Sequence, residues 1–412
     1  MHSNTDVLIL GGGVAGLSAA RELERRGIAN LVLEARDRLG GRIHTLRDAA
    51  WPHPIELGAE FLHGLPRKLK LPHRFSLRPR DADGEHWVVD ARGLRQADGA
   101  AEDAMNLLGE MTGPDTTADA WLDKHTKGPQ RRLARQFVSG FYAADPKSVS
   151  TRFLVEESEA SEEVHGERMF RPTRGYDTLV QHLARDVKAH LSTQITRVTW
   201  KRGRVDVDAT DALGHARSYR AKKLVIALPL GVLKTNSVRF SPVVDGLQLA
   251  RKHLEVGPIV KLVLRFREPF WAKHRAKDFT MLHFTNGPQQ AWWRCRPFDS
   301  PVLVGWSAGP QAKKQPSVDG ALHAFERAFR VKNLSRLLDA ALVVDWSADP
   351  FARGGYMVQP VGLPSPLQQL FAPVDDTLFF AGEHTSFEGH AGTVHGAVWS
   401  GQRAAREVCD CG

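Results

Sequence analysis

The stretch Val7–Glu34, VLILGGGVAGLSAARELERRGIANLVLE, has the pattern of a strand, a helix and a second strand in succession. Its first apolar run ends at a glycine cluster in which Gly11, Gly13 and Gly16 follow the G-x-G-x-x-G spacing. Apolar residues at helical spacing come next, and a second apolar run ends at an acid, Glu34, about 20 residues after the first glycine. The pattern predicts a βαβ unit that binds a dinucleotide, within an α/β fold.

Each residue of this unit has a chemical reason for its position. Gly11 permits the tight turn, Gly13 lets the backbone approach a pyrophosphate, and Gly16 lets helix and strand pack closely. The helix N-terminus offers free N–H groups and a partial positive charge to the phosphates. Glu34 can accept both ribose hydroxyls. We therefore expect these four residues to form the nucleotide end of a cofactor site.

A second glycine turn follows directly, in EARDRLGGRIHT (Glu34–Thr45), and ends at Arg42. This stretch resembles the signature shared by flavin amine oxidases, phytoene desaturases and protoporphyrinogen oxidases. The resemblance implies FAD as the cofactor, with Arg36 and Arg42 approaching its adenosine and pyrophosphate side. The same motif adds three expected cofactor residues, Ala35, Gly40 and Gly41.

Near the other end of the chain, an apolar run leads into Gly382 and Glu383. The stretch LFFAGEHTSFEGHAGTVHGAVWSGQRAA (378–405) resembles the C-terminal flavin motif of polyamine oxidases and the lysine-specific histone demethylase. The resemblance implies that Glu383, beside Gly382, meets the ribityl chain of FAD. It also implies a helix that starts near Thr393 and Val394 and points its N-terminus at the pyrimidine edge of the flavin, where reduction places negative charge.

The two halves of the expected FAD site lie at opposite ends of the chain, so the middle must include an inserted lobe. The resemblance implies the two-lobed flavin amine oxidase fold, α/β overall, in which a Rossmann-type FAD domain carries an inserted α+β substrate domain. We expect the FAD domain at 1–65, 166–238 and 352–412, and the substrate-binding domain at 66–165 and 239–351.

Three stretches in the middle of the chain resemble parts of the family's FAD domain. The segment 170–183, with Arg-Gly-Tyr at its centre, resembles the motif by which such chains return to that domain. In the strand expected at 195–200, the resemblance implies that Val198 contacts adenine through its backbone. The segment 224–233, LVIALPLGVL, resembles the strand that leads out into the second lobe.

The segment Glu56–Gly64, ELGAEFLHG, resembles the polyamine oxidase segment at the edge of the flavin. The resemblance places Gly58 and Ala59 at the cofactor and His63 in the wall of the substrate tunnel. For Glu60 it leaves two interpretations, an acid that binds the amine or a hydrogen-bonded polar residue under the flavin. The second interpretation also remains open for His63.

Lys261 interrupts an apolar strand expected within 256–266, VGPIVKLVLRF. A charged lysine is costly to bury there unless it is paired or solvated. The resemblance offers a functional explanation, because the matching lysine of the family holds a water against the flavin N5 atom and assists the reaction with oxygen. The alternative is a strand lysine whose ammonium group reaches the solvent.

Amine oxidases flank the substrate nitrogen with aromatic rings, which position a neutral amine and disfavour bulk water. Tyr356 matches one of these walls, but the second would fall at Thr393, so the cage is incomplete. The cysteine that tethers the flavin in monoamine oxidases would precede Tyr356, where this chain has Gly355, so FAD is expected to be non-covalent. Core packing is the preferred role of three tryptophans that could replace the missing wall: Trp292, Trp293 and Trp399.

A run of acids precedes the return to the FAD domain, and a solvated helix face is its preferred interpretation. The alternative, suggested by polyamine oxidases, is that the run helps to collect a cationic substrate. The net charge of +9 argues mildly against long-range collection of polyamines. The acids are Glu156, Glu157, Glu159, Glu162 and Glu163.

Composition excludes several other classes of protein. The chain of 412 residues suits two domains, and its basic residues are scattered rather than gathered in a stripe, so we expect no nucleic-acid partner. No apolar run reaches the roughly 18 residues of a membrane span, and the N-terminus lacks the pattern of a signal peptide. Cys295, Cys409 and Cys411 have no metal-ligand spacing and favour a reduced, cytoplasmic setting, without a metal site.

These features together predict an FAD-dependent amine oxidase. It is expected to oxidise a C–N bond of a polyamine or another primary or secondary amine to an imine, while oxygen is reduced to hydrogen peroxide. Lys261, His63 and Tyr356 are the expected catalytic residues. A desaturase or protoporphyrinogen oxidase acting on C–C bonds is one alternative, and a non-catalytic binding protein on the same fold is another. The oligomeric state stays open.

Overall fold

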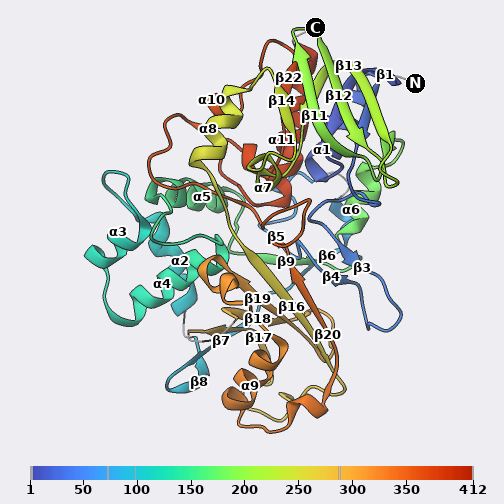
Figure 1. Ribbon diagram of the computed structural model, residues 1–412. Coiled ribbons are helices and arrows are strands. Elements are labelled where there is room, and N and C mark those ends of the chain that lie inside the picture. The colour runs from blue at the N-terminus through green and yellow to red at the C-terminus, as the bar shows by residue number, and fades with distance from the viewer. Residues whose placement is uncertain (1–2, 72–73, 98, 286, 288, 411–412) are drawn as a thin grey trace.

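Two large β-sheets organise the chain, one in the upper half of Figure 1 and the other in the lower half. The computed structural model describes residues 3–71, 74–97, 99–285, 287 and 289–410. Within these residues, no helix is long and apolar enough to cross a membrane.

The first sheet has eight strands and is parallel around the glycine-rich turn. Its strands, in spatial order, are β10 (Ala189–His190), β2 (Asn30–Leu33), β1 (Ser3–Leu10), β13 (Ala216–Ile226), β12 (Arg204–Thr210), β11 (Gln194–Lys201) and β14 (Arg239–Ser241), while β22 (Leu378–Phe380) pairs with the end of β13. Strands from both ends of the chain and from its middle therefore form one sheet.

Strand β1 is buried on both faces, which explains its unbroken apolar run. Val7 and Ile9 belong to one core cluster, whereas Leu8 and Leu10 belong to the cluster on the other face of the sheet. A parallel strand that is covered on both sides needs apolar residues at every position. The expected βαβ unit is thus present.

The second sheet has seven strands and draws on two separate segments of the chain. In spatial order they are β20 (Leu338–Asp345), β16 (Ile259–Phe266), β19 (Val302–Ala308), β18 (Ala291–Arg294), β17 (Phe279–Phe284), β7 (Glu85–Asp90) and β8 (Gly93–Gln96). All of these strands fall within the segments assigned to the substrate-binding domain. The short β14 lies just beyond the expected boundary at 238 but pairs with β11 of the first sheet.

Short strand pairs connect the two large sheets. They are β3 (Thr45–Leu46) with β4 (Ile55–Glu56), β15 (Glu255–Val256) with β21 (Met357–Val358), and β5 (Leu62–His63) with β9 (Met169–Pro172), which also pairs with β6 (Pro79–Asp81). The segment expected at the flavin edge thus reaches from β4 to β5.

Helices cover the faces of both sheets and form a separate group at the side of the molecule (Figure 1). The side group comprises α2 (Ala100–Gly109), α3 (Ala118–His125), α4 (Gly128–Phe141) and α5 (Thr151–Glu163). The other helices are α1 (Val14–Arg25), α6 (Asp177–Leu183), α7 (Leu230–Leu233), α8 (Asp245–His253), α9 (Val318–Phe329), α10 (Leu367–Leu370) and α11 (Val394–Asp410).

Helices α1 and α11, from opposite ends of the chain, pack directly against each other on the first sheet. Small residues permit this approach: a Cβ atom on Gly401 of α11 would lie 2.1 Å from the carbonyl oxygen of Ala15 in α1. The packing brings the N-terminus of α11 to the same side of the sheet as the glycine-rich turn. It therefore positions the two expected halves of the cofactor site together.

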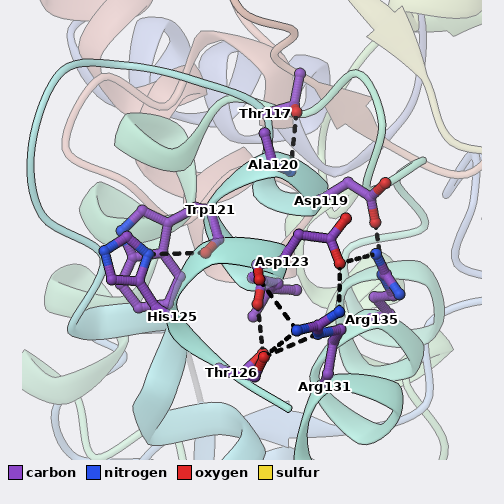
Figure 2. Close-up of polar contacts among 10 residues, drawn as sticks. Thr117, Asp119, Ala120, Trp121, Asp123, His125, Thr126, Arg131 and Arg135 are labelled. Carbon is purple, nitrogen blue, oxygen red and sulfur yellow. Dashed lines mark hydrogen bonds and ion pairs between the residues drawn. The ribbon is translucent and has the colours of Figure 1, made fainter. Parts of the chain in front are cut away.

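Helix α4 carries aromatic residues toward the space between the sheets. Ion pairs join this helix to α3 (Figure 2). Arg135 donates to Asp119 at 2.5 Å and to Asp123 at 3.0 Å, and Arg131 donates to Asp123 at 2.6 Å. Arg131 also donates to the carbonyl oxygen of Thr126, just after the end of α3. These contacts hold the outer side of α4 in place.

Candidate active site

A cavity of about 500 Å³ extends from the glycine-rich turn of the first sheet to strands of the second sheet. Its wall includes segments from the first 63 residues, from α4 and α5, from β16 and from the region between β21 and α11. This volume falls in the range of cofactor and small-molecule sites. The cavity is therefore the candidate active site.

The glycine-rich turn provides open space at one position and close packing at the others. A Cβ atom added to Gly13, the N-cap of α1, would have no neighbour within 4 Å. In contrast, a Cβ atom on Gly16 would lie 2.0 Å from the carbonyl oxygen of Gly11. The positive φ of Gly11, 101°, is itself unfavourable for a side chain. Gly13 thus leaves room for a ligand at the helix N-terminus, and Gly16 serves helix packing.

Glu34 lies at the end of β2 and its buried carboxylate is held by the backbone. Its Oε2 atom accepts the N–H of Gly12 at 2.6 Å, and its Oε1 atom accepts the N–H of Arg36 at 2.9 Å. Glu34, Ala35 and Arg36 all line the cavity. A carboxylate fixed in this way is oriented to accept further hydrogen bonds from a ribose.

The second glycine turn packs directly on the first. Gly13 and Gly40 form a β-bridge, and a Cβ atom on Gly41 would lie 3.3 Å from the Cα atom of Gly13. Gly40 has a φ of 104°, which glycine tolerates best. Close by, a Cβ atom on Gly58 would lie 1.8 Å from the carbonyl oxygen of Arg42. These contacts leave no room for side chains between the turns.

The two expected cofactor arginines have structural partners as well as a place in the cavity wall. Arg36 forms an ion pair with Asp349 at 2.6 Å and its guanidinium lies over the ring of Phe351 at 5.4 Å. Arg42 donates to Glu383 at 2.9 Å and also to the carbonyl oxygen of Gly355. Each arginine is therefore oriented before a ligand arrives.

Glu383 connects the C-terminal motif to the rest of the site. Besides Arg42, its carboxylate accepts the N–H of Gly392 at 3.0 Å and that of Met357 at 3.3 Å. Thr393 follows and caps α11, since its hydroxyl accepts the N–H of Gly396 at 3.0 Å. Gly382, Glu383, Thr393 and Val394 all line the cavity. The start of α11 is thus directed at the cavity, as the resemblance implied.

Lys261 lies in the middle of β16 with its side chain fully buried, at 0% exposure. Its ammonium group donates to Glu60 Oε2 and, at 3.2 Å, to the carbonyl oxygen of Gly58. Because no part of the side chain reaches bulk solvent, Lys261 is a paired lysine at the cavity wall and not a lysine that extends to the surface.

Glu60 is the centre of a buried polar cluster. Its Oε1 atom accepts hydrogen bonds from Arg171 at 2.5 Å and from the indole of Trp293 at 2.9 Å, while Oε2 accepts from Lys261. Burial alone would raise the pKa of Glu60, but the charges of Lys261 and Arg171, with these hydrogen bonds, lower it to about 2. Glu60 is therefore ionised, and protein groups bind both of its oxygens. This agrees with its interpretation as a hydrogen-bonded polar residue and not as an acid that binds the amine.

Aromatic rings and a neutral imidazole form the other wall of the cavity. The ring of His63 contacts that of Phe141, from α4, edge to face at 5.4 Å. Tyr356 donates its hydroxyl to the carbonyl oxygen of Phe141, which joins the expected aromatic wall to α4. Burial lowers the pKa of His63 to about 4, so the imidazole is uncharged at neutral pH. Phe141 remains 41% exposed although it lines the cavity, as a wall for a ligand would be.

Glu157 enters the same cavity from α5 and has an unusual environment for an acid. Its carboxylate is buried and, among the residues that the structure describes, accepts only two backbone N–H groups, those of His390 at 3.1 Å and Ala391 at 3.0 Å. Burial raises the pKa of Glu157 to about 8, against the effect of the two hydrogen bonds. This finding corrects the interpretation of the acid run as a solvated face, which holds for the exposed Glu156, Glu159, Glu162 and Glu163.

The structure brings almost all the predicted site residues to this one cavity. Gly16 packs behind the turn, as its expected role requires. Val198 is a correction: it is buried in the core of the first sheet, with β12 and β14 on either side of its strand, and does not line the cavity. Ile195, three residues earlier, lines it instead. The residue of this strand that faces the cavity therefore lies three positions earlier than predicted.

The tryptophans follow their expected roles with one exception. Trp292 is buried in the core of the second sheet, and Trp399 packs in another core cluster and donates to the carbonyl oxygen of Leu69 at 3.2 Å. Trp293 is likewise buried in a core cluster, but it also lines the cavity and donates to Glu60, which core packing alone did not predict. Several cavity residues had not been identified from the sequence: Phe137, Phe141, Trp306, His390 and His395.

The residues present fit FAD. The open space at Gly13 lies at the N-terminus of α1, where a pyrophosphate would bind, and Glu34 lies where a ribose would follow. The N-terminus of α11 and Lys261 line the opposite part of the cavity, where they suit a flavin ring. Neither of the described cysteines, Cys295 and Cys409, lines the cavity, and no group of potential metal ligands occurs among the described residues.

Comparison with known proteins agrees with this geometry. Residues 14–409 match the family described as flavin containing amine oxidoreductase. The chain is 30% identical to polyamine oxidase 3 of Oryza sativa subsp. japonica (97% of this chain, 88% of that protein) and 29% identical to polyamine oxidase 2 of Arabidopsis thaliana (97% and 87%). In fold it resembles cyclohexylamine oxidase from Brevibacterium oxydans, with a TM-score of 0.82, 23% identity and 99% coverage of both chains.

The matched family spans nearly the whole chain, and the glycine turns, Glu383 and the start of α11 form one site for its cofactor. The likeness to the solved oxidase supports the two-lobed α/β fold. Gly355, where monoamine oxidases carry the tethering cysteine, leaves FAD without a covalent link. This chain therefore belongs to the flavin-containing amine oxidoreductases and is an FAD-dependent amine oxidase that binds its cofactor non-covalently.

Proposed function

We propose that the chain oxidises an amine with a second basic nitrogen, a diamine or polyamine, and passes the electrons to oxygen. Glu157 carries this proposal. Four carboxylates line the cavity in the described part of the chain, and two of them, Glu60 and Glu383, are ion-paired. Glu34 lies at the nucleotide end, so Glu157 is the acid that lacks a cationic partner on the substrate side.

A cationic substrate group would resolve the unfavourable environment of Glu157. A buried carboxylate with no counter-ion holds its proton to unusually high pH, here to a pKa of about 8. An ammonium group within hydrogen-bond reach would stabilise the ionised form and form a charge-assisted contact. The polyamine oxidases of Oryza sativa and Arabidopsis thaliana, at 30% and 29% identity, support the same class of substrate.

FAD, when bound, supplies the two-electron chemistry, by accepting a hydride from the carbon beside the reacting nitrogen and passing the electrons to oxygen, which becomes hydrogen peroxide. The protein holds the amine in the neutral form that can lose a hydride. The uncharged His63 can share a hydrogen bond with this neutral nitrogen without placing a positive charge beside it. Phe141, Tyr356 and Trp306 line the same space and exclude water from it.

Lys261 has the charge and the position to assist the oxygen step. Its buried ammonium lies in the cavity wall, where a fixed positive charge stabilises negative charge that develops on oxygen. The expected catalytic roles of Lys261, His63 and Tyr356 thus remain part of this proposal.

The test is the substrate range of Glu157→Gln, measured at pH 9, where Glu157 is mostly ionised, with a diamine and with a monoamine of equal chain length. The variant should lose roughly 10- to 100-fold in kcat/KM for the diamine, equivalent to about 1.5–3 kcal/mol for a hydrogen bond to a charged group. The monoamine value should stay near that of the native enzyme. Glu159→Gln, an exposed acid on the same helix, is the matched control. An equal loss with both amines would refute the role of Glu157 in recognising a second nitrogen.

We also propose a cytoplasmic location and the two-domain division at the boundaries given above. Free thiols at Cys295 and Cys409 support a reducing compartment. The segments that supply each sheet support the division, except at 238, where β14 extends the first sheet to residue 241. Cell fractionation tests the location, and limited proteolysis near 65 and 352 tests the division.

A further inference from the structure

We propose that Glu60 is a positioning residue for Lys261, whose ammonium group it holds at the cavity wall for the reaction with oxygen. The inference rests on the proposed use of oxygen as acceptor. The two side chains share a hydrogen-bonded ion pair in which both partners are buried, with exposures of 0% and 4%. Because both side chains are buried, water cannot take the place of either partner unless the core opens.

The geometry of Glu60 leaves it no free oxygen for a substrate. One oxygen accepts from Lys261, and the other accepts from both Arg171 and Trp293. Arg171 is itself held in place, since its Nε atom donates to the carbonyl oxygen of Arg296 at 2.6 Å. A substrate ammonium would have to share an oxygen with one of three buried donors, two of which are already cationic. Glu60 therefore acts on the protein's own lysine.

The charges in this cluster are unequal. Lys261 and Arg171 contribute two buried positive charges, and Glu60 contributes one negative charge between them. Of the titratable groups near Lys261, burial raises the pKa of Cys295 to about 12, so its thiol is neutral, and that of Glu56 to about 7, so Glu56 offsets the excess only as the pH rises above 7. Without Glu60, two buried cations would face each other with no carboxylate between them, and the ammonium would lose its anchor at the cavity wall.

A glutamine at position 60 would keep the size of the side chain but change its charge and its hydrogen bonds. Its carbonyl oxygen can still accept one hydrogen bond, but its NH₂ group would face a donor, either Lys261 or the Arg171 and Trp293 pair. The ammonium of Lys261 would thus lose a partner and a counter-charge together. This predicts a slower reaction of the reduced enzyme with oxygen.

The experiment is stopped-flow kinetics of the two half-reactions, between pH 6 and pH 9. It compares the native holoenzyme with Glu60→Gln, Lys261→Met and Glu60→Gln/Lys261→Met. Reduction by the amine under anaerobic conditions should change less than about threefold in Glu60→Gln, whereas reoxidation by oxygen should slow by about tenfold or more. The double variant should be no slower than Lys261→Met alone, because Glu60 acts through the lysine.

Glu56→Gln is the matched control for general loss of a buried acid. Glu56 is buried nearby, but it accepts from the N–H of Tyr176 at 2.7 Å and from Thr45 at 2.8 Å, with no hydrogen bond to Lys261. At pH 6, where the raised pKa of Glu56 leaves its carboxyl group mostly neutral, the reoxidation rate of Glu56→Gln should stay close to that of the native enzyme. If Glu56→Gln slows reoxidation at pH 6 as much as Glu60→Gln does, the contact proposed here is refuted.

A second variant covers the case in which Glu60→Gln does not fold. Glu60→Gln/Arg171→Met removes one charge of each sign and so restores the native charge of the cluster. If Glu60 positions the lysine, reoxidation stays slow in this variant; if it only balances charge, the native rate returns and the proposal fails.

Acid unfolding of the FAD-free protein gives a readout independent of activity. The folded-state pKa of Glu60, about 2, lies below its ordinary value of 4.5, so its stabilising contribution is present above pH 4.5 and is lost as the pH falls toward 2. Glu60→Gln should lack this part of the acid transition. An identical acid transition in both proteins would contradict the ion pair.

The outcomes separate this inference from the proposed function. If the reduced native enzyme reacts with oxygen and Glu60→Gln matches it in rate and pH dependence, the positioning role is wrong while the function stands. If the reduced native enzyme does not react with oxygen, the proposed acceptor is wrong and the role of Glu60 falls with it.

Discussion

Arg42 and Glu383 are 341 positions apart in the chain, yet the guanidinium of Arg42 donates to the Glu383 carboxylate at 2.9 Å. The other carboxylate oxygen accepts the N–H of Gly392, just before α11. Both side chains line the cofactor cavity. The first and last segments of the chain are therefore joined at the cofactor site by one ion pair, independently of any ligand.

Loss of this pair should weaken the junction between the two segments. Arg42→Met removes a hydrogen bond to a charged group that is largely buried, so the FAD-free protein should lose about 2 kcal/mol in its free energy of unfolding. Urea denaturation of Arg42→Met, Glu383→Gln and the double variant measures this. Strictly additive losses would show that the two side chains are not coupled.

Substitution by valine should have different consequences at the two positions: loss of flavin at Gly13 and loss of stability at Gly16. Gly13→Val places its side chain in open space, so the protein should fold but contain little flavin. Gly16→Val would collide with the carbonyl oxygen of Gly11, so the protein itself should be unstable. The measurements are the flavin-to-protein ratio and the thermal midpoint without FAD. Full flavin occupancy in Gly13→Val would mean that the pyrophosphate is placed wrongly.

The flavin should leave the protein on denaturation. Gly355 occupies the position of the tethering cysteine, and a Cβ atom there would lie 1.9 Å from the side chain of Ile259. Acid precipitation should therefore yield a colourless pellet and a yellow supernatant. Flavin absorbance that stays with the precipitated chain would contradict non-covalent binding.

Selectivity for a diamine should depend on pH through Glu157. Its pKa of about 8 means that the carboxyl group is mostly protonated at pH 7 and mostly ionised at pH 9. The ratio of kcat/KM for a diamine to that for a monoamine should rise about tenfold over this range, because only the ionised form pairs with a cation. In Glu157→Gln the ratio should be flat. A rise of equal size in the variant would exclude Glu157 as its source.

The nucleotide end of the site could be predicted from the sequence because its determinants are local. Gly11, Gly13, Gly16 and Glu34 fall within one βαβ unit, whose turn and strand ends follow from short-range backbone geometry. The strand at 195–200 was also found, but a twofold strand period does not define which residue faces a ligand, and Val198 was chosen where Ile195 lines the cavity.

The substrate side could not be predicted to the same degree, because it is assembled from distant segments. Phe141 meets His63 only after α4 packs beside the second sheet, and no motif in α4 marks this contact. Glu157 did carry a signal that was missed. It falls on the buried stripe of α5 with Phe153 and Ala160, at helical spacing, whereas the neighbouring acids do not.

The most direct test of the account is an anaerobic titration of the purified yellow protein with a diamine, followed by admission of oxygen. We expect an equimolar amount of diamine to bleach the flavin absorbance, and oxygen to restore it with an equimolar yield of hydrogen peroxide. Flavin that stays oxidised with every diamine, polyamine and monoamine supplied would contradict the proposed reaction.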